Sequence, residues 1–161
     1  MHGLTSAWIL KALNDNNQGK LISIDLPRRL WNEYFPDQEM GPNFEAELDI
    51  GDNNPGWIIP EDLLNDWELH IGPSNKHLES LLDHNSVDLF IHDSDHSYEI
   101  MSYECLTAFE KIPDAMFVID NFNMCDFTLE YLGSNKMNYM FMDEVDDSNN
   151  IETCTAICKF P

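Results

Sequence analysis

The chain has 161 residues and a mass of 18.7 kDa, and its 30 acidic and 8 basic side chains give a formal net charge of −22 and a pI near 4.2. This length suits one domain, and a hydrophobic content of 43% supplies enough apolar surface for a core, which argues against intrinsic disorder. The negative charge repels phosphate backbones and anionic lipids, so binding to nucleic acid or to a membrane surface is not expected.

No targeting segment is recognisable in the sequence. No apolar run approaches the roughly 18 residues that a membrane helix needs, and the chain does not start with a basic region followed by a hydrophobic one. Cys105, Cys125, Cys154 and Cys158 form no C-x-x-C pair, so we expect reduced thiols, most of them in the core. These observations predict a soluble, cytoplasmic protein.

Short apolar runs alternate with stretches of helical spacing, which is typical of an α/β fold with a mainly parallel sheet. The predicted strands cover residues 21–25, 67–71, 87–91 and 116–119. The predicted helices cover residues 5–14, 75–83, 98–111 and 124–132. Two further apolar runs, 139–142 and 155–158, flank a polar stretch, and this pattern predicts a C-terminal antiparallel hairpin.

The segment 27–66 differs from the rest of the chain. Prolines and glycines interrupt it repeatedly, and five aromatic side chains give it apolar anchors: Trp31, Tyr34, Phe35, Phe44 and Trp57. Long insertions of this kind are usually functional loops or disordered segments. The aromatic content favours a folded lid.

Polar side chains follow the predicted strands at their carboxyl ends, where open parallel sheets bind ligands. The first strand ends in Asp25, the third is followed by Asp93 and Asp95, and the fourth by Asp120 and Asn121. Parallel pairing of the third and fourth strands would bring Asp93, Asp120 and Asn121 together. Such an all-oxygen cluster suits a hard divalent cation such as Mg²⁺, Mn²⁺ or Ca²⁺.

Several of these residues have a second interpretation. Asp25 either accepts the hydroxyls of a ribose or caps a turn. The sequence Gly3-Leu4-Thr5-Ser6 either offers backbone N–H groups to an anion or simply caps a helix. The roles of the two histidines that flank the Asp93–Asp95 segment are also open. We expect His92 to be a partly buried, hydrogen-bonded residue, while His96 either supports the metal ligands or exchanges protons.

A calcium-binding loop is another interpretation of the acidic residues that follow the third predicted strand. Asp93, Asp95, Ser97 and Glu104 occupy the first, third, fifth and twelfth places of the EF-hand pattern. Tyr98 stands where that loop needs glycine, and the preceding run reads as a strand, not as an entering helix. Both features disfavour this interpretation.

With these motifs in place, the chain resembles the class I S-adenosylmethionine-dependent methyltransferases. It is most similar to the methyltransferase-24 family, which groups with macrocin-type and catechol-type O-methyltransferases. The block Asp-x-Asp-His-x-Tyr-Glu at 93–99 is the most specific part of the likeness, which spans nearly the whole chain. The resemblance implies a Rossmann-like sheet with helices on both faces.

The resemblance also implies a set of cofactor contacts. Gly3, Thr5 and Ser6 match the end of the glycine-rich loop that holds the methionine part of S-adenosylmethionine, and Asp25 matches the residue that binds its ribose. Ser74 follows Pro73, which replaces the acidic residue that touches adenine in relatives, and Ser74 is expected to compensate. Asp93 is expected to contribute to cofactor binding as well.

For the chemistry, the resemblance assigns Asp93, Asp120 and Asn121 as ligands of Mg²⁺. Asp95, or alternatively the adjacent His96, falls where sugar-modifying relatives place a general base. The implied reaction is metal-assisted O-methylation of a small hydroxylated acceptor such as a sugar. The cation would lower the pKa of an acceptor hydroxyl and hold it in line with the methyl group.

The sequence departs from the family at its start. Relatives have a strand ending in an acidic residue and glycines before the position of Gly3, and here the chain begins at Met1. In this fold the missing strand lies between the strands at 21–25 and 87–91, so its absence leaves two unpaired edges, which favour self-association. A catalytically inactive remnant that binds a metal or a protein is therefore the alternative function.

Overall fold

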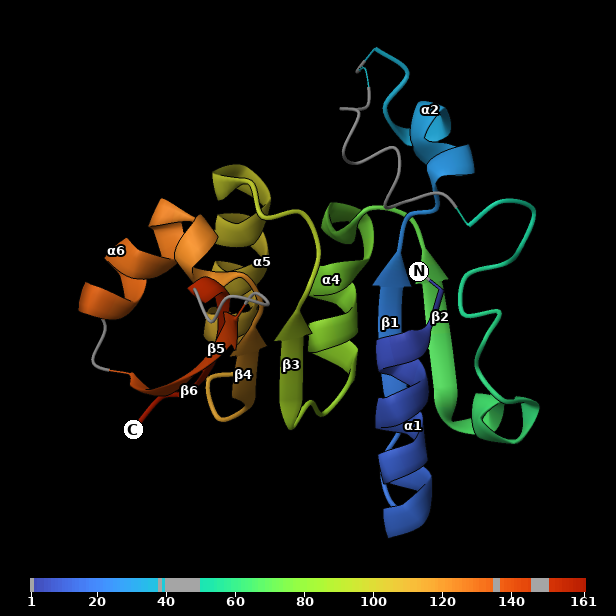
Figure 1. Ribbon diagram of the computed structural model, residues 1–161, viewed down its shortest axis with the longest axis horizontal. Helices are drawn as coiled ribbons and strands as arrows, with labels where there is room; N and C mark the ends of the chain where they lie inside the picture. The colour runs from blue at the N-terminus through green and yellow to red at the C-terminus, as the bar shows by residue number, and fades with distance from the viewer. Residues whose placement is uncertain (1, 38, 40–49, 135–136, 146–150) are drawn as a thin grey trace. The chain divides into compact units, whose positions relative to one another are not determined.

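The computed structural model describes residues 2–37, 39, 50–134, 137–145 and 151–161. The chain divides into two compact units, Met1–His77 and Leu78–Pro161 (Figure 1). Each unit is an α/β arrangement, and together they confirm the predicted fold class. None of the described helices is both long enough and apolar enough to cross a bilayer.

The first unit contains a pair of parallel strands, β1 (Leu21–Asp25) and β2 (Trp67–Ile71), whose register runs from Leu21 beside Trp67 to Asp25 beside Ile71. The helix α1 (Leu4–Asn16) runs along this pair (Figure 1). The remaining elements are short: η1 (Arg28–Leu30), α2 (Trp31–Tyr34) and η2 (Glu61–Asp66). Because β1 and β2 point the same way, their carboxyl ends share one edge.

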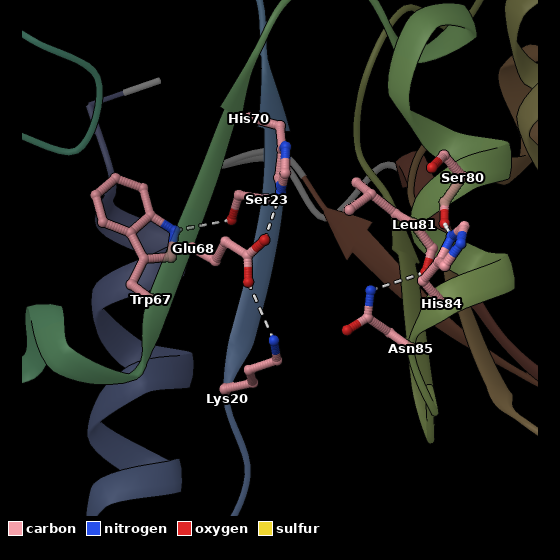
Figure 2. A network of polar contacts seen from close by, with 9 residues as sticks. All are labelled: Lys20, Ser23, Trp67, Glu68, His70, Ser80, Leu81, His84 and Asn85. Atoms are coloured by element: carbon pink, nitrogen blue, oxygen red, sulfur yellow. Dashed lines mark hydrogen bonds and ion pairs between the residues drawn. The ribbon is translucent and has the colours of Figure 1, made fainter.

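Two side-chain hydrogen bonds join β2 to β1 and to the residue just before it, and a third contact lies within β2 (Figure 2). The Trp67 ring N–H donates to the Ser23 hydroxyl at 3.0 Å, and Glu68 lies between Lys20 at 3.0 Å and His70 at 2.7 Å. The hydrogen bond from Lys20, followed by that from His70, lowers the pKa of the exposed Glu68 carboxyl. A two-stranded sheet is marginal by itself, so these pairs add to the register.

The core of the first unit includes part of the segment that the sequence suggests as a lid. Ile59 and Leu63 are buried against Leu10 of α1, with Ala7, Leu21 and Trp67 packed around them. Residues 50–66 therefore help to build this unit. Residues 38 and 40–49 lie outside the described part of the chain, and the lid stays a prediction.

The second unit is organised around a four-stranded sheet. The helix α4 (Ser74–His84) leads into β3 (Leu89–His92), α5 (Tyr98–Lys111), β4 (Met116–Ile119), η3 (Phe122–Met124), α6 (Asp126–Ser134), β5 (Asn138–Val145) and β6 (Ile151–Lys159). The strand order is β3-β4-β6-β5: β3 and β4 are parallel, and β6 runs antiparallel to both β4 and β5. The C-terminal hairpin is thus confirmed.

An aromatic cluster fills the core of this second unit. Phe117 of β4 is fully buried and contacts the rings of Phe90, Phe109 and Phe160. Phe109 also stacks on Tyr131, which attaches α6 to α5. Phe117 alternates along β4 with more exposed residues, so one face of the strand carries the packing.

The boundaries of several elements differ from the predicted ones, and two of the differences bear on the site. The third strand begins at Leu89 instead of 87 and includes His92, because β3 continues as far as its ladder with Ile119 of β4. The helix expected at 124–132 starts at Asp126, since Phe122–Met124 form a separate 3-10 turn. Cys105, Cys125 and Cys158 are buried free thiols, and Cys154 is half-buried.

The strand pairing defines the edges of the two sheets. Among the described strands, β1 pairs with β2 alone and β3 pairs with β4 alone. Each therefore has one edge without a strand partner.

Candidate functional site

The carboxyl ends of β3 and β4 bring the acidic residues of the second unit together. The parallel ladder pairs His92 with Ile119, and the Asp120 backbone N–H donates to the His92 carbonyl at 3.0 Å, which extends the pairing by one residue. Asp93 and Asp120 are consequently neighbours at the same sheet edge. The sequence anticipates this juxtaposition because parallel strands end together.

One histidine completes this group. Asp93, His96 and Asp120 each offer one ligand atom, and these three atoms all lie within 4.8 Å of one another. His96 and Asp120 are half-buried, whereas Asp93 is more exposed. We call these three residues the Asp-His-Asp cluster. Two carboxylates and an imidazole at such distances form a donor set that fits a divalent cation.

The electrostatics of the cluster reflect the crowding of two carboxylates. Partial burial raises the pKa of the Asp93 carboxyl, the Asp120 carboxylate beside it raises it further, and His96 lowers it. A cation bound between the two carboxylates would remove this repulsion, because it stabilises both charged forms.

The Asp120 carboxylate is held from the neighbouring strand. The Thr155 hydroxyl of β6 donates to Asp120 Oδ1 at 2.7 Å. This contact depends on the antiparallel register of β4 and β6, which places Ile119 opposite Ala156. A donor on one oxygen fixes the rotation of the carboxylate and leaves its other oxygen in a defined direction.

Asn121 follows in a left-handed conformation, with φ 47° and ψ 37°. Its amide nitrogen lies 3.5 Å from both ring nitrogens of His96. The turn after it is anchored at both ends: Asn123 Oδ1 accepts from the Cys154 N–H at 2.8 Å, and the Thr128 hydroxyl donates to the Phe122 carbonyl. The structure therefore places Asn121 next to the cluster, in contact with its histidine.

The loop between β3 and α5 is clamped by its own side chains. Asp95 Oδ1 accepts from the Ser97 N–H at 2.9 Å, and the Ser97 hydroxyl caps α5 by accepting from the Ile100 N–H. Ser94 donates to the buried Glu104 at 2.8 Å. The backbone that carries His96 is thus fixed on both sides. A strand precedes this loop instead of a helix, so it is not an EF-hand.

His92 differs from its expected state. Its side chain is only 1% exposed, and both ring nitrogens lack a hydrogen-bond partner. Its Nε2 lies 3.4 Å from Glu104 Oε2, without the alignment of a hydrogen bond. Burial, followed by the nearby His96, lowers the pKa of His92 to about 4, so the ring is neutral at neutral pH. The expectation of a partly buried, hydrogen-bonded histidine was wrong because the strand extends through His92.

Apart from Asp93, which follows β3, the residues expected to bind the cofactor lie at the carboxyl ends of β1 and β2 and at the start of α1. Gly3 precedes α1 with φ 99°, and a Cβ there would lie 2.7 Å from the Gly56 backbone. Thr5 and Ser6 belong to the first turn of α1. Asp25 ends β1, and burial raises the pKa of its carboxyl.

The loop after β2 is anchored on the end of β1. The Gly72 N–H donates to the Asp25 carbonyl at 2.9 Å, and Ser74 then begins α4. The Tyr34 hydroxyl and His77 Nε2 both contact the Ile71 carbonyl, at 3.3 and 3.1 Å. These contacts fix the backbone on which Asp25 and Ser74 stand.

Sequence reasoning missed Thr155 and Glu104 as parts of the site. Thr155 is far from Asp120 along the chain, and only the strand register brings it near. In the sequence, Glu104 stands out only as the twelfth place of the disfavoured calcium-loop pattern. Its burial beside Ser94 and His92 follows from the packing of α5.

Comparison with known proteins identifies the fold. The sequence model of the methyltransferase-24 family, described as a methyltransferase domain, matches residues 1–122. A search of curated protein sequences found no match.

The solved structures that are similar to this chain include three neighbours with nearly the same TM-score. They are the O-methyltransferase TomG from Streptomyces achromogenes, involved in tomaymycin synthesis and in complex with SAM (TM-score 0.63, 16% identity), cofactor-bound Rv0187 from MTB (0.62, 16%), and an O-methyltransferase from Bacillus cereus in complex with SAH (0.61, 12%). The alignments cover 98–99% of this chain and 70% of each of those chains.

Proposed function

Because the chain belongs to the methyltransferase-24 family of class I S-adenosylmethionine-dependent methyltransferases, we propose that it transfers a methyl group from S-adenosylmethionine to a hydroxyl oxygen of a small acceptor with the help of a divalent cation. The observation that carries this proposal is the Asp-His-Asp cluster at the carboxyl ends of β3 and β4. Two of the structural neighbours, TomG and the Bacillus cereus protein, are O-methyltransferases, which supports the reaction type.

Cofactor binding is assigned to Gly3, Thr5, Ser6, Asp25, Ser74 and Asp93. The first turn of α1 offers backbone N–H groups, which suit the carboxylate of the methionine part. The partly buried Asp25 accepts hydrogen bonds from the ribose hydroxyls, as an acidic residue after a strand does in nucleotide-binding folds. The anchored loop from Gly72 to Ser74 supports this assignment, since a fixed backbone loses little entropy on binding.

The cation, Mg²⁺ or alternatively Mn²⁺ or Ca²⁺, is assigned to Asp93, Asp120 and Asn121. When bound, it supplies Lewis acidity that lowers the pKa of an acceptor hydroxyl. Asp93 and Asp120 contribute the negative charge that holds it, and the hydroxyl of Thr155 keeps the Asp120 carboxylate oriented. Asn121 contributes a neutral oxygen ligand from its left-handed turn.

The base in this proposal is Asp95 or His96. It accepts the proton of the acceptor hydroxyl as the oxygen lone pair forms the new bond to the methyl carbon, and the electrons of the broken carbon–sulfur bond remain on sulfur. The acceptor is a small hydroxylated compound such as a sugar. We further propose that residues 27–66 cover the reacting groups and that the chain works in the cytoplasm, without nucleic acid or membrane.

A catalytically inactive remnant is the second candidate. It is favoured by the strand pairing, because β1 and β3 each keep one edge without a partner strand among the described residues. Such a chain would bind a metal or a protein without transferring a methyl group. Bare edges also promote the formation of a homo-oligomer.

Calorimetric titration tests the two candidates against each other. The protein is titrated with S-adenosylmethionine and with Mg²⁺, separately and together, and methyl transfer is then followed with a panel of hydroxylated acceptors. We expect Asp25→Ala to lose cofactor binding and keep cation binding, and Asp93→Ala to lose cation binding. The exposed Asp114→Ala serves as the control for a lost carboxylate. Binding of the cation without any cofactor binding would favour the remnant, and no heat with either ligand would refute the enzyme.

A further inference from the structure

We infer that His96 is a third ligand of the cation, beside Asp93 and Asp120, so that the site selects a transition-metal ion such as Mn²⁺ over Mg²⁺. This inference rests on the proposed function, because it concerns the same cation. It adds an imidazole to the ligand set and changes the preferred ion.

The first argument is the spacing of the three donors. A divalent cation of this class binds its nitrogen and oxygen ligands at about 2.0–2.2 Å, so two of its ligands are about 3 Å apart when adjacent and about 4.2 Å apart when opposite. The donor atoms of Asp93, His96 and Asp120 all lie within 4.8 Å of one another. Because three donors 4.8 Å apart would each lie about 2.8 Å from their common centre, side-chain movements of less than about 1 Å would bring all three onto one ion.

The second argument is how His96 is held. Its backbone lies between two fixed points, since Asp95 is tied to the Ser97 N–H and Ser97 caps α5. Its ring nitrogens make only long contacts within the described residues, at 3.5 Å to the amide nitrogen of Asn121. A nitrogen without a short hydrogen bond keeps its lone pair for a metal.

The donor set then decides the ion. Mg²⁺ prefers oxygen ligands in near-ideal octahedral geometry and keeps several waters, whereas imidazole suits transition metals. Two carboxylates with one imidazole therefore favour Mn²⁺, Co²⁺ or Zn²⁺. The Thr155 hydroxyl, which orients Asp120, acts equally on either class of ion.

The test uses the full chain after removal of metal by a chelator, with Mn²⁺ and Mg²⁺ as probes. Calorimetry gives both affinities, and pulsed electron paramagnetic resonance of the Mn²⁺ complex detects a coordinated ¹⁴N nucleus. We expect wild type to bind Mn²⁺ at least about tenfold more tightly than Mg²⁺ and to show nitrogen coupling. His96→Ala should lose the nitrogen coupling. It should also bind Mn²⁺ at least roughly 10- to 100-fold more weakly than wild type, because a residue that only orients a metal ligand already contributes that much affinity.

Controls separate the two proposals. His84→Asn removes an exposed histidine whose ring contacts Ser80, and it should keep both the coupling and the affinity. Circular dichroism confirms that each variant is folded. If wild type binds either ion, Asp93→Ala loses it and His96→Ala changes nothing, the inference is overturned while the proposed function stands. If wild type binds neither ion, the metal-assisted function fails together with the inference.

Discussion

The hydrogen bond from Thr155 to Asp120 provides the sharpest test of how the fold supports the site. Thr155→Val removes the hydroxyl but keeps a β-branched side chain of nearly equal volume on β6. The substitution leaves Asp120 Oδ1 without its donor at 2.7 Å. It therefore separates the orienting contact from the packing of the strand.

The size of the effect follows from the acceptor. A hydrogen bond to a charged group contributes about 1.5–3 kcal/mol to the free energy of unfolding. Thr155→Val removes such a bond and leaves the partly buried Asp120 carboxylate without this partner. We expect the free energy of unfolding of the metal-free variant to fall by about this amount. Since groups that orient metal ligands contribute roughly 10- to 100-fold to affinity, Mn²⁺ binding should weaken within that range.

Urea denaturation at neutral pH measures the first quantity and calorimetric Mn²⁺ titration the second. Thr155→Ser is the matched variant, since it keeps the hydroxyl and should recover both values. A double-mutant cycle with Asp120→Ala isolates the pair, with a coupling energy above about 0.5 kcal/mol expected. Additive effects in that cycle, or full Mn²⁺ affinity in Thr155→Val, would show that Thr155 does not orient Asp120.

Three further predictions concern stability. Burial and the Asp120 carboxylate raise the pKa of Asp93 in the folded state, so the fold loses stability as pH rises above the ordinary pKa of 3.8. Metal-free Asp93→Asn should therefore unfold at a higher urea concentration than wild type at pH 7, and this difference should vanish near pH 3. The same difference in urea midpoint at both pH values would contradict this prediction. Ser97→Ala removes the cap of α5 and should cost about 1 kcal/mol in urea denaturation, whereas no change would show that the Asp95 turn suffices. Gly56→Ala should lower the melting temperature by several degrees, because φ is 76° and a Cβ there would collide with the Trp67 ring; a variant as stable as wild type would disprove the close approach.

Local patterns were enough to predict most of the elements. The strands at 21–25, 67–71 and 116–119 and the helix at 98–111 match the structure because their apolar periodicity and flanking turn residues agree with the final packing. The third strand was misplaced by a residue or two, since its end is set by the ladder to β4 and not by its own residues.

The sequence by itself determined which side chains reach the sheet edge. Asp25, Asp93 and Asp120 follow apolar strands, and the direction of parallel strands alone predicts that Asp93 and Asp120 meet. The Asp-x-Asp-His-x-Tyr-Glu block likewise pointed to the family without any coordinates. These features are local in the chain, or depend on a single pairing.

Tertiary structure alone decided which donors surround the two carboxylates. His96 joins them through the path of a clamped loop, Thr155 reaches Asp120 through an antiparallel register, and Glu104 is buried beside His92 through the packing of α5. The apolar periodicity of helices and strands in the sequence does not predict any of these contacts. Their geometry depends on register and side-chain packing, which arise only when distant segments meet.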